Sequence, residues 1–269
     1  MLTLVIGIAV AALCSAVAGP TLGIGWAIFL GFVGFLVPAV VINLLVKKRM
    51  ETIFNAVQTE VEEMQDQMRR KVNMMQTKMV SGGKGLQKRL EKEQAKSIRD
   101  AIKILDRVAP LRKWNLLAQR QENTLRAQMH YQIKEFEKAD EYFKKCFVMD
   151  PLTLAMKLTR QYKTDGVEAV EKGFEKGVKR FKDEQATILY ALYSWILLKE
   201  ERADDALVLL DEGKDKTEDE TIRTNWEHIA NGRLRRFSNA GLGDQWYALH
   251  LETPKPVKVK QRFGSKRLR

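Results

Sequence analysis

The stretch that decides the fold consists of two apolar runs, LTLVIGIAVAALCSAVA at residues 2–18 and LGIGWAIFLGFVGFLVPAVVINLLV at residues 22–46. Neither run contains a Lys, Arg, Asp or Glu. A helix needs about 20 apolar residues to cross the hydrocarbon core of a bilayer. Gly19-Pro20 separates the runs and is a strong helix breaker. We therefore predict a transmembrane helical hairpin over residues 1–46, with spans at about 2–18 and 22–46.

Three basic residues, Lys47, Lys48 and Arg49, follow the second run directly. Basic residues beside a membrane span stay on the cytoplasmic side of the bilayer. This pattern predicts an integral protein of the cell (inner) membrane whose residues 47–269 lie in the cytoplasm. Small residues permit close contact between neighbouring membrane helices, and the two runs carry them at Gly7, Ala11, Ser15, Gly31 and Gly34.

Two other topologies are compatible with the apolar segment. Ala16-Val17-Ala18 resembles the cleavage site of a signal peptide, although no charged region precedes the first run. Cleavage there would leave residues 22–46 as a single span with the same cytoplasmic side. A shallow re-entrant hairpin is the third possibility.

The charged residues of the chain all follow residue 46, and the formal net charge is +12. Residues 231–269 contain ten basic and two acidic side chains, so this excess is concentrated toward the end of the sequence. Cys146 is the one cysteine after the apolar runs, which excludes a disulfide framework there. The three histidines are distant in sequence, and no His/Cys group has the spacing of metal ligands. We predict a protein that is not an enzyme and has no metal or cofactor.

Residues 50–80 contain no Gly or Pro and have a helical apolar pattern. The apolar residues follow intervals of 4, 3, 4, 4, 3 and 4, at Val57, Val61, Met64, Met68, Val72, Met75 and Met79. This amounts to an eleven-residue repeat, which is typical of a nearly straight coiled coil. The segment is therefore either a self-association helix, which would make a homo-oligomer, or an amphipathic helix packed on its own domain.

Ser81-Gly82-Gly83-Lys84-Gly85 follows this helix and lacks the phosphate-loop pattern GxxxxGK[ST]. We interpret it as a flexible joint, so residues 47–85 form a juxtamembrane helix with a Gly-rich end. From residue 86 the chain shows helical periodicity with short breaks and no alternating strand pattern. The predicted fold class is all-α, and residues 86–252 form the predicted helical domain.

One part of this domain has the spacing Ala139-x3-Phe143, followed by Cys146 and Pro151. This pattern resembles the second half of a tetratricopeptide repeat (TPR). In that family the small residues let two helices touch, the aromatic residue packs between repeats and the proline ends the second helix. A second, similar segment has Tyr190-Ala191 on its first helix and Ala203, Leu207 and Leu210 on its second. The resemblance implies an α-solenoid of about three helical pairs, with a groove that binds a protein partner.

The middle pair, about residues 154–181, shows no clear repeat signature, and residues 211–220 look like a break. Residues 217–237 would cap the solenoid, with Trp226 and Ile229 facing the last pair. The aromatic residues of 242–249 would dock on the end of the domain.

The last segment, residues 253–269, has no acidic residue and should be disordered when alone. Its basic side chains could bind anionic lipid or RNA, or could simply be solvated; they are Lys255, Lys258, Lys260, Arg262, Lys266, Arg267 and Arg269.

Three functions are compatible with these features. The first is a membrane-anchored, cytoplasmic-facing TPR-like scaffold for protein–protein interaction. The second is a membrane-tethered protein that binds RNA or the ribosome through its basic tail. The third is a homo-oligomeric structural membrane protein assembled through residues 50–80.

Overall fold

The computed structural model describes residues 2–77 and 84–253, and every regular element within these ranges is a helix. The all-α prediction is therefore confirmed. The chain divides into two compact units, Met1–Met149 and Asp150–Arg269. This boundary lies inside the predicted helical domain, residues 86–252.

The two apolar runs form helices α1 (Leu2–Leu22) and α2 (Ile24–Thr77). The chain reverses at Gly23 rather than at the predicted Gly19-Pro20, and Pro20 lies within α1. Gly23 has φ +88°, in the left-handed region that glycine adopts without steric cost and that commonly ends helices. The φ of proline is compatible with a helix, so α1 continues past Pro20 although the hydrogen bond of its missing N–H is lost.

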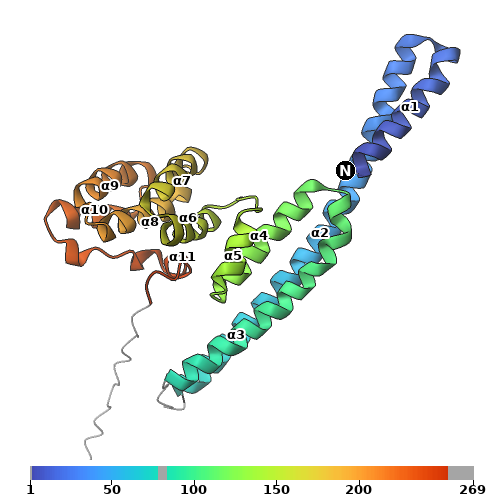
Figure 1. The fold of residues 1–269 in the computed structure, drawn as a ribbon. Coiled ribbons are helices and arrows are strands. Elements are labelled where there is room, and N and C mark those ends of the chain that lie inside the picture. Colours follow the sequence, from blue (N-terminus) through green and yellow to red (C-terminus); the bar gives the residue numbers. More distant parts are fainter. Residues whose placement is uncertain (1, 78–83, 254–269) are drawn as a thin grey trace, which may run out of the picture. The chain divides into compact units, whose positions relative to one another are not determined.

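Helices α1 and α2 pack closely against each other through the small residues of the sequence pattern (Figure 1). A Cβ atom built on Gly34 would lie 2.9 Å from Cys14 Sγ, and one on Gly7 would lie 2.9 Å from the Phe35 ring. Ser15 donates a hydrogen bond from Oγ to the carbonyl oxygen of Ala27 at 3.1 Å. Larger residues at these glycines would force the helices apart.

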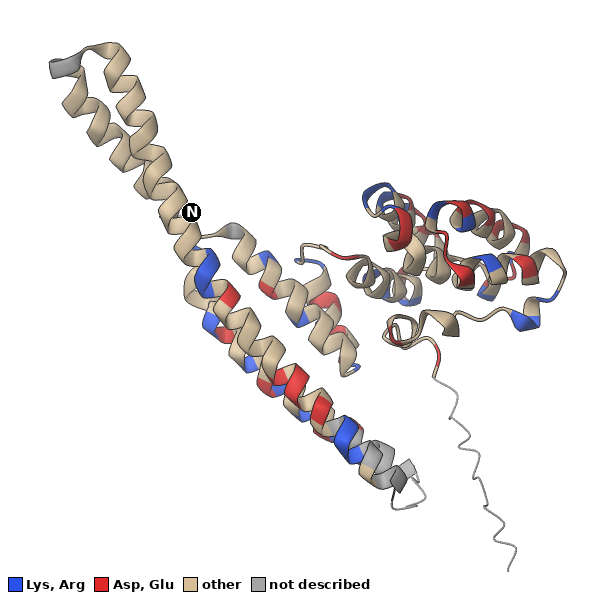
Figure 2. Cartoon of the chain, turned by 180° about the vertical axis from the view of Figure 1, so that it is seen from behind, with Lys and Arg blue, Asp and Glu red and all other residues tan. Residues whose placement is uncertain are grey.

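The second run does not end at the basic residues. Helix α2 continues from Ile24 through Lys47 to Thr77 without a break, so the predicted second span and the predicted juxtamembrane helix are one element. At a rise of about 1.5 Å per residue its 54 residues extend for about 80 Å. Figure 2 shows that the first part of this helix carries no charged residue and the second part carries many.

Helix α3 (Lys84–Leu105) lies along the charged part of α2 in both ribbon views (Figures 1 and 2). The contact buries Val57 and Met64 of α2 against one face of α3, formed by Ile98, Ala101, Ile102 and Leu105. Met129 of helix α4 (Leu116–Gln132) completes this cluster. Because α4 shares a core with α2 and α3, the first predicted helical pair belongs to the same unit as the apolar helices.

A 3-10 helix, η1 (Asp106–Lys113), connects α3 to α4. Helix α5 (Phe136–Phe143) then packs on α4. The Tyr131 ring of α4 meets the rings of Phe136 and Phe143 edge to face, an arrangement that stabilises aromatic pairs.

The second unit consists of α6 (Pro151–Asp165), α7 (Val167–Arg180), η2 (Asp183–Ala186), α8 (Thr187–Lys199), α9 (Ala203–Thr217), α10 (Glu220–Ala230), η3 (Leu234–Arg236), η4 (Ala240–Leu242) and α11 (Asp244–Tyr247). Helix α8 forms its centre and packs against α6, α7 and α9. Residues 187–194 of α8 are all buried, as expected of a helix that is apolar on every side.

The predicted middle pair forms the helices α6 and α7. One expectation for this unit changes, since the predicted break at 211–220 is shorter: α9 continues to Thr217. Gly213 allows this, since its missing side chain leaves room for the Tyr190 ring; a Cβ there would lie 2.9 Å from Tyr190 Cδ1.

Candidate functional site at the end of the uncharged segment

The most distinctive site of the first unit lies where the uncharged part of α2 ends. Here η1 packs on α2, and Val46 and Met50 are buried against Val108, Leu111 and Ala118. This contact places the buried side chains of Val108 and Leu111, followed by Trp114, beside the first charged residues of α2.

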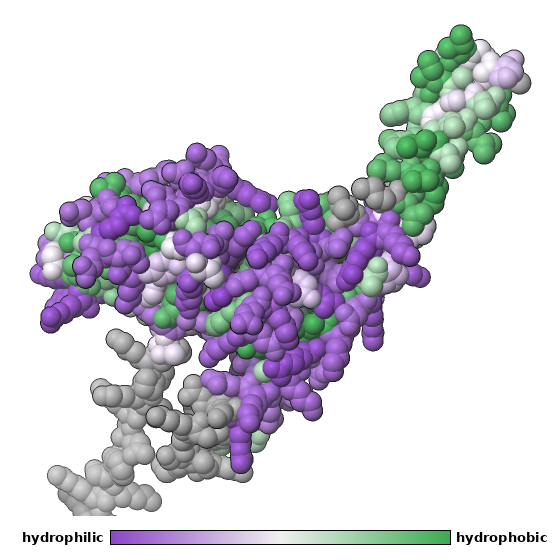
Figure 3. All heavy atoms as spheres, viewed as in Figure 1, coloured by the Kyte–Doolittle hydropathy of each residue, from purple (hydrophilic) through white to green (hydrophobic). Residues whose placement is uncertain are grey.

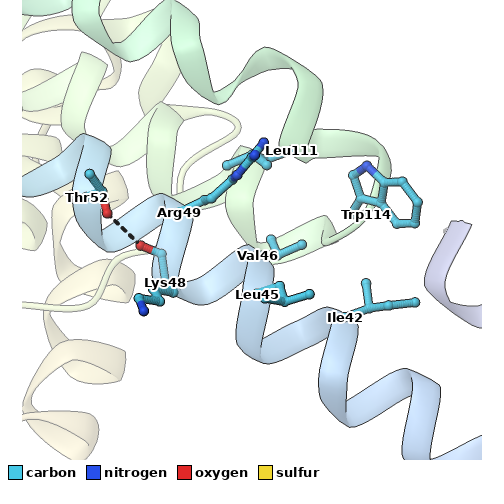
Figure 4. Close-up of a pocket in the computed structure, with 8 residues that line it drawn as sticks. All are labelled: Ile42, Leu45, Val46, Lys48, Arg49, Thr52, Leu111 and Trp114. Carbon is cyan, nitrogen blue, oxygen red and sulfur yellow. Dashed lines mark hydrogen bonds between the residues drawn. The ribbon is translucent and has the colours of Figure 1, made fainter.

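A pocket of about 560 Å³ opens at this contact. Ile42, Leu45 and Val46 line it from α2, and Leu111 and Trp114 line it from the other side (Figure 4). Lys48, Arg49 and Thr52, which follow these apolar residues along α2, also contribute to the lining. The pocket is apolar over most of its surface and has two basic residues at its border, a combination that suits an amphiphilic ligand.

The three basic residues that predict the topology have different surroundings. Lys47 lies 3.8 Å from Glu51, one turn along α2. Lys48 and Arg49 are exposed at the pocket, and no carboxylate pairs with either of them within the described residues. Two unpaired cations beside an apolar pocket can bind an anionic group.

The backbone around the pocket is held in place by a hydrogen bond and a buried ion-pair network. Thr3 donates from Oγ1 to the carbonyl oxygen of Trp114 at 2.7 Å, which connects the start of α1 to the end of η1. Glu122 of α4 is completely buried and accepts hydrogen bonds from Arg112 Nε at 2.7 Å and Arg126 Nε at 2.8 Å. Arg126 also donates to Asp106 at 2.6 Å. The network thus connects both ends of η1 to α4.

Arg126 stays charged despite its burial. Burial lowers the pKa of its guanidinium, but the hydrogen bonds to Asp106 and Glu122 outweigh this effect and raise the pKa above its ordinary value. A buried charge is stable only when it is paired in this way. The network fixes the position of η1, and through it the position of Leu111 and Trp114 in the pocket.

A second polar cluster lies at the other end of α4. Glu135 accepts hydrogen bonds from Arg99 at 2.8 Å and from Lys138 at 3.0 Å, and His130 Nδ1 lies 2.9 Å from its second oxygen. Burial raises the pKa of Glu135, but these hydrogen bonds outweigh it and lower the pKa to about 2. Burial lowers the pKa of His130, whose ring stacks on Tyr142. The cluster connects α3 to the α4–α5 turn.

The predicted repeat residues differ in their burial. Ala139 and Phe143 are buried in the first unit, and Tyr190, Ala191 and Leu210 are buried in the second. Ala203, Leu207 and Cys146 are half-buried. Pro151 differs from its expected role: α5 ends eight residues before it, and Pro151 instead opens α6, where Asp150 caps the helix by accepting from the Thr153 amide at 2.7 Å. Proline is favoured at the first position of a helix because no hydrogen bond is lost there.

One face of α8 is covered by the chain itself. Asn239 donates to the carbonyl oxygen of Ala191 at 2.9 Å, and the Trp246 ring meets Trp195 edge to face. Glu252 accepts hydrogen bonds from the indole nitrogens of both tryptophans. Tyr190 and Tyr193, on another face of α8, meet Phe174 of α7. Residues 239–252 therefore cover this face of α8.

Ile229 and Trp246 are buried in the second unit, as expected, while Trp226 is half-buried under the Lys214 ammonium.

In residues 50–80, Val57, Val61 and Met64 pack on α3 of the same chain, so the amphipathic alternative describes this part of the helix. The side chains of Met68, Val72, Met75 and Met79, the joint from Ser81 to Gly83, and the basic residues from Lys255 to Arg269 lie outside the part of the chain whose placement the structure describes.

The roles of Trp114, Thr3 and the Glu122 network at this pocket were not predicted from the sequence. A signal existed for Trp114, since it follows Arg112 and Lys113 and tryptophan beside basic residues is typical of a membrane–water interface. Glu122 and Arg126 look like an ordinary exposed pair four residues apart, and only their burial distinguishes them.

No group of three or more His, Cys, Asp or Glu side chains that could hold a metal ion occurs in the described residues. No protein-family model, curated protein or solved structure matches the sequence.

Proposed function

We propose that the protein is a membrane-anchored helical scaffold, without enzymatic activity, that holds a protein partner at the cytoplasmic face of the cell (inner) membrane. In this proposal α1 and the first part of α2 cross the bilayer as a hairpin. The observation that carries the proposal is the continuity of α2, because one helix joins the apolar segment to the core of the first unit.

The exposed apolar surface of α1 and α2 supports a membrane position. Both helices are long and apolar enough to span a bilayer. Most large hydrophobic side chains that are exposed in the described residues lie between Leu2 and Leu45; Ile24, for example, is 80% exposed. Figure 3 shows this apolar surface on the N-terminal helices, next to a hydrophilic surface on the rest of the first unit. Covering each such side chain is worth roughly 1.5–3 kcal/mol, and lipid would cover all of them.

The packing of α1 favours a retained hairpin over a cleaved signal peptide. Cleavage after Ala18 would remove Gly7, which leaves room for the Phe35 ring, and Cys14, whose side chain packs on Gly34. It would also remove the Thr3 hydroxyl that bonds to Trp114. A hairpin that retains α1 would keep all of these contacts.

Labelling of single cysteines tests the topology. In a full-length variant with Cys14→Ala and Cys146→Ser, Gly25→Cys lies near the turn in open space, and Glu201→Cys lies at an exposed helix end. We expect an impermeant maleimide to label the first from outside intact spheroplasts and the second only in inside-out vesicles. Labelling of both positions from the same side would exclude a spanning hairpin and favour the re-entrant form.

A protein partner is proposed to bind the face of α8 that residues 239–252 cover, by displacing them. Trp246→Ala weakens the covering segment without changing α8. Photocrosslinking from Lys199 in intact cells, followed by mass spectrometry, should then recover the same partner in larger amount from the variant than from the wild type. An unchanged crosslinking pattern would mean that the partner binds elsewhere or that none exists.

A second proposal is self-association through the part of residues 50–80 that follows Met64. Light scattering of the full chain in detergent measures it directly, and a monomer mass excludes it.

A further inference from the structure

We propose that the pocket between α2 and η1 is a binding site for one anionic phospholipid of the cytoplasmic leaflet. The acyl chain would lie against Leu45, Leu111 and Trp114, and the phosphate would bind Lys48 and Arg49. The inference rests on the membrane position proposed above, but it concerns a different property, the selective binding of one lipid.

The direction of the lining is the first argument. The apolar residues Ile42, Leu45 and Val46 precede Lys48, Arg49 and Thr52 along a single helix, so Ile42 and Arg49 are about 10 Å apart along its axis. In the proposed orientation the apolar end faces the bilayer and the basic end faces the cytoplasm. A phospholipid in the same leaflet has its acyl chain and phosphate in this order.

The charge at the polar end is the second argument. Lys48 and Arg49 have no acidic partner among the described residues, whereas Lys47 has Glu51 and Arg112 has Glu122. Lys48 and Arg49, which both line the pocket, therefore remain available to bind an anionic group. Thr52 Oγ1 donates to the Lys48 carbonyl oxygen and still has lone pairs to accept a hydrogen bond. Basic pockets beside membrane helices bind anionic lipid headgroups.

The support of the pocket wall is the third argument. Leu111 and Trp114 belong to a segment that Thr3, Arg112 and Glu122 hold against α1 and α4. The pocket volume of about 560 Å³ is within the ordinary range for small-molecule sites. The pocket is therefore a supported feature of the fold and not a gap between loosely packed side chains.

Native mass spectrometry of the full chain provides the test. The protein is released from detergent micelles in the presence of phosphatidylglycerol or phosphatidylcholine with identical acyl chains. We expect one phosphatidylglycerol to be retained at least about tenfold more tightly than phosphatidylcholine, since each basic residue near an anionic headgroup contributes severalfold to affinity. The double variant Lys48→Gln/Arg49→Gln should remove this preference.

Two further variants make the outcome specific. Arg69→Gln/Arg70→Gln removes the same charge from exposed positions of α2, about 30 Å away, and should keep the preference. Leu45→Trp fills the apolar end without changing any charge and should reduce lipid retention. Equal retention of the two lipids, or a preference that survives Lys48→Gln/Arg49→Gln, would overturn the proposal.

The membrane position is measured separately by carbonate extraction of each variant. A protein that stays in the membrane pellet but shows no lipid preference contradicts the lipid site alone. A protein that is extracted contradicts the membrane anchor as well.

Discussion

The Thr3 hydroxyl donates a 2.7 Å hydrogen bond to the carbonyl oxygen of Trp114, although 111 positions separate the two residues in the sequence. Thr3 is buried at the start of α1, and Trp114 follows the end of η1. This bond connects the beginning of the apolar hairpin to the element that packs on α2 where the charged residues begin.

Thr3→Val should therefore loosen η1, because valine has the same shape as threonine but cannot donate a hydrogen bond. We expect a loss of about 1 kcal/mol in the free energy of unfolding of the first unit. Thermal unfolding in detergent, followed by circular dichroism, measures this loss. Thr3→Ser keeps the hydroxyl and is the control; if it destabilises as much as Thr3→Val, the hydrogen bond is not the cause.

Gly31→Val should disrupt the contact between α1 and α2. A Cβ on Gly31 would lie 2.2 Å from Ser15 Oγ and 3.5 Å from the Ala11 carbonyl oxygen, and a second branch would meet the same helix. Overpacking of this kind costs about 1–3 kcal/mol. Gly25→Val is a matched control on the same helix, because no atom lies within 4 Å of the added Cβ. Equal melting temperatures of the two variants would contradict the observed helix contact.

Glu122→Gln should be among the most damaging conservative substitutions in the first unit. It removes the carboxylate that pairs with Arg112 and Arg126, and Arg126 is itself buried. Breaking a buried ion pair from one side costs about 3 kcal/mol or more, because the remaining charge stays buried without its partner. Asp106→Asn removes the exposed member of the same network and should cost less than about 1 kcal/mol. Chemical denaturation of both variants gives the comparison.

The His130–Glu135 cluster predicts that the first unit loses stability in acid. The pKa of Glu135 is about 2 in the folded protein and 4.5 when free, so its contribution is complete above pH 4.5 and is lost as the pH falls toward 2. The pKa of His130 is below its ordinary 6.5, so its contribution is also lost as the pH falls, beginning near 6.5. Melting temperatures between pH 7.5 and 3 should therefore decrease steadily.

Glu135→Gln tests the carboxylate directly. It removes the decrease below pH 4.5, and because the Glu135 carboxylate also raises the pKa of His130, the variant should lower the pKa of His130 further. A variant that melts with the same pH profile as the wild type would show that Glu135 does not cause the acid sensitivity.

Composition and periodicity were sufficient to predict the helical class and the two apolar helices. A long segment without charged residues has few alternatives to an apolar helix. The small residues of α1 and α2 already indicated a close contact between the two helices. The position of the turn was less predictable, because Gly19-Pro20 and Gly23 are both strong candidates. The structure shows that the residue with positive φ, Gly23, reverses the chain.

The candidate site was not predictable from the sequence, because it depends on contacts between distant segments. The pairing of Val57 with Ile98, and of Val46 with Leu111, brings together residues more than 40 positions apart. Local periodicity shows which face of a helix is apolar, but it does not show which helix will cover that face. The coiled-coil pattern of residues 50–80 illustrates this, since α3 of the same chain covers the part that the structure describes.

The uninterrupted α2 has a mechanical consequence if its first part spans the bilayer. The part of α2 after Pro38 contains no proline, so it transmits a change of inclination along its length, and the inclination of a membrane helix responds to bilayer thickness. Thinning of the lipid would tilt the apolar residues after Pro38 and swing the charged part of α2, with α3 and η1 packed on it, through the same angle. The protein would then report the physical state of the bilayer as a displacement above its surface.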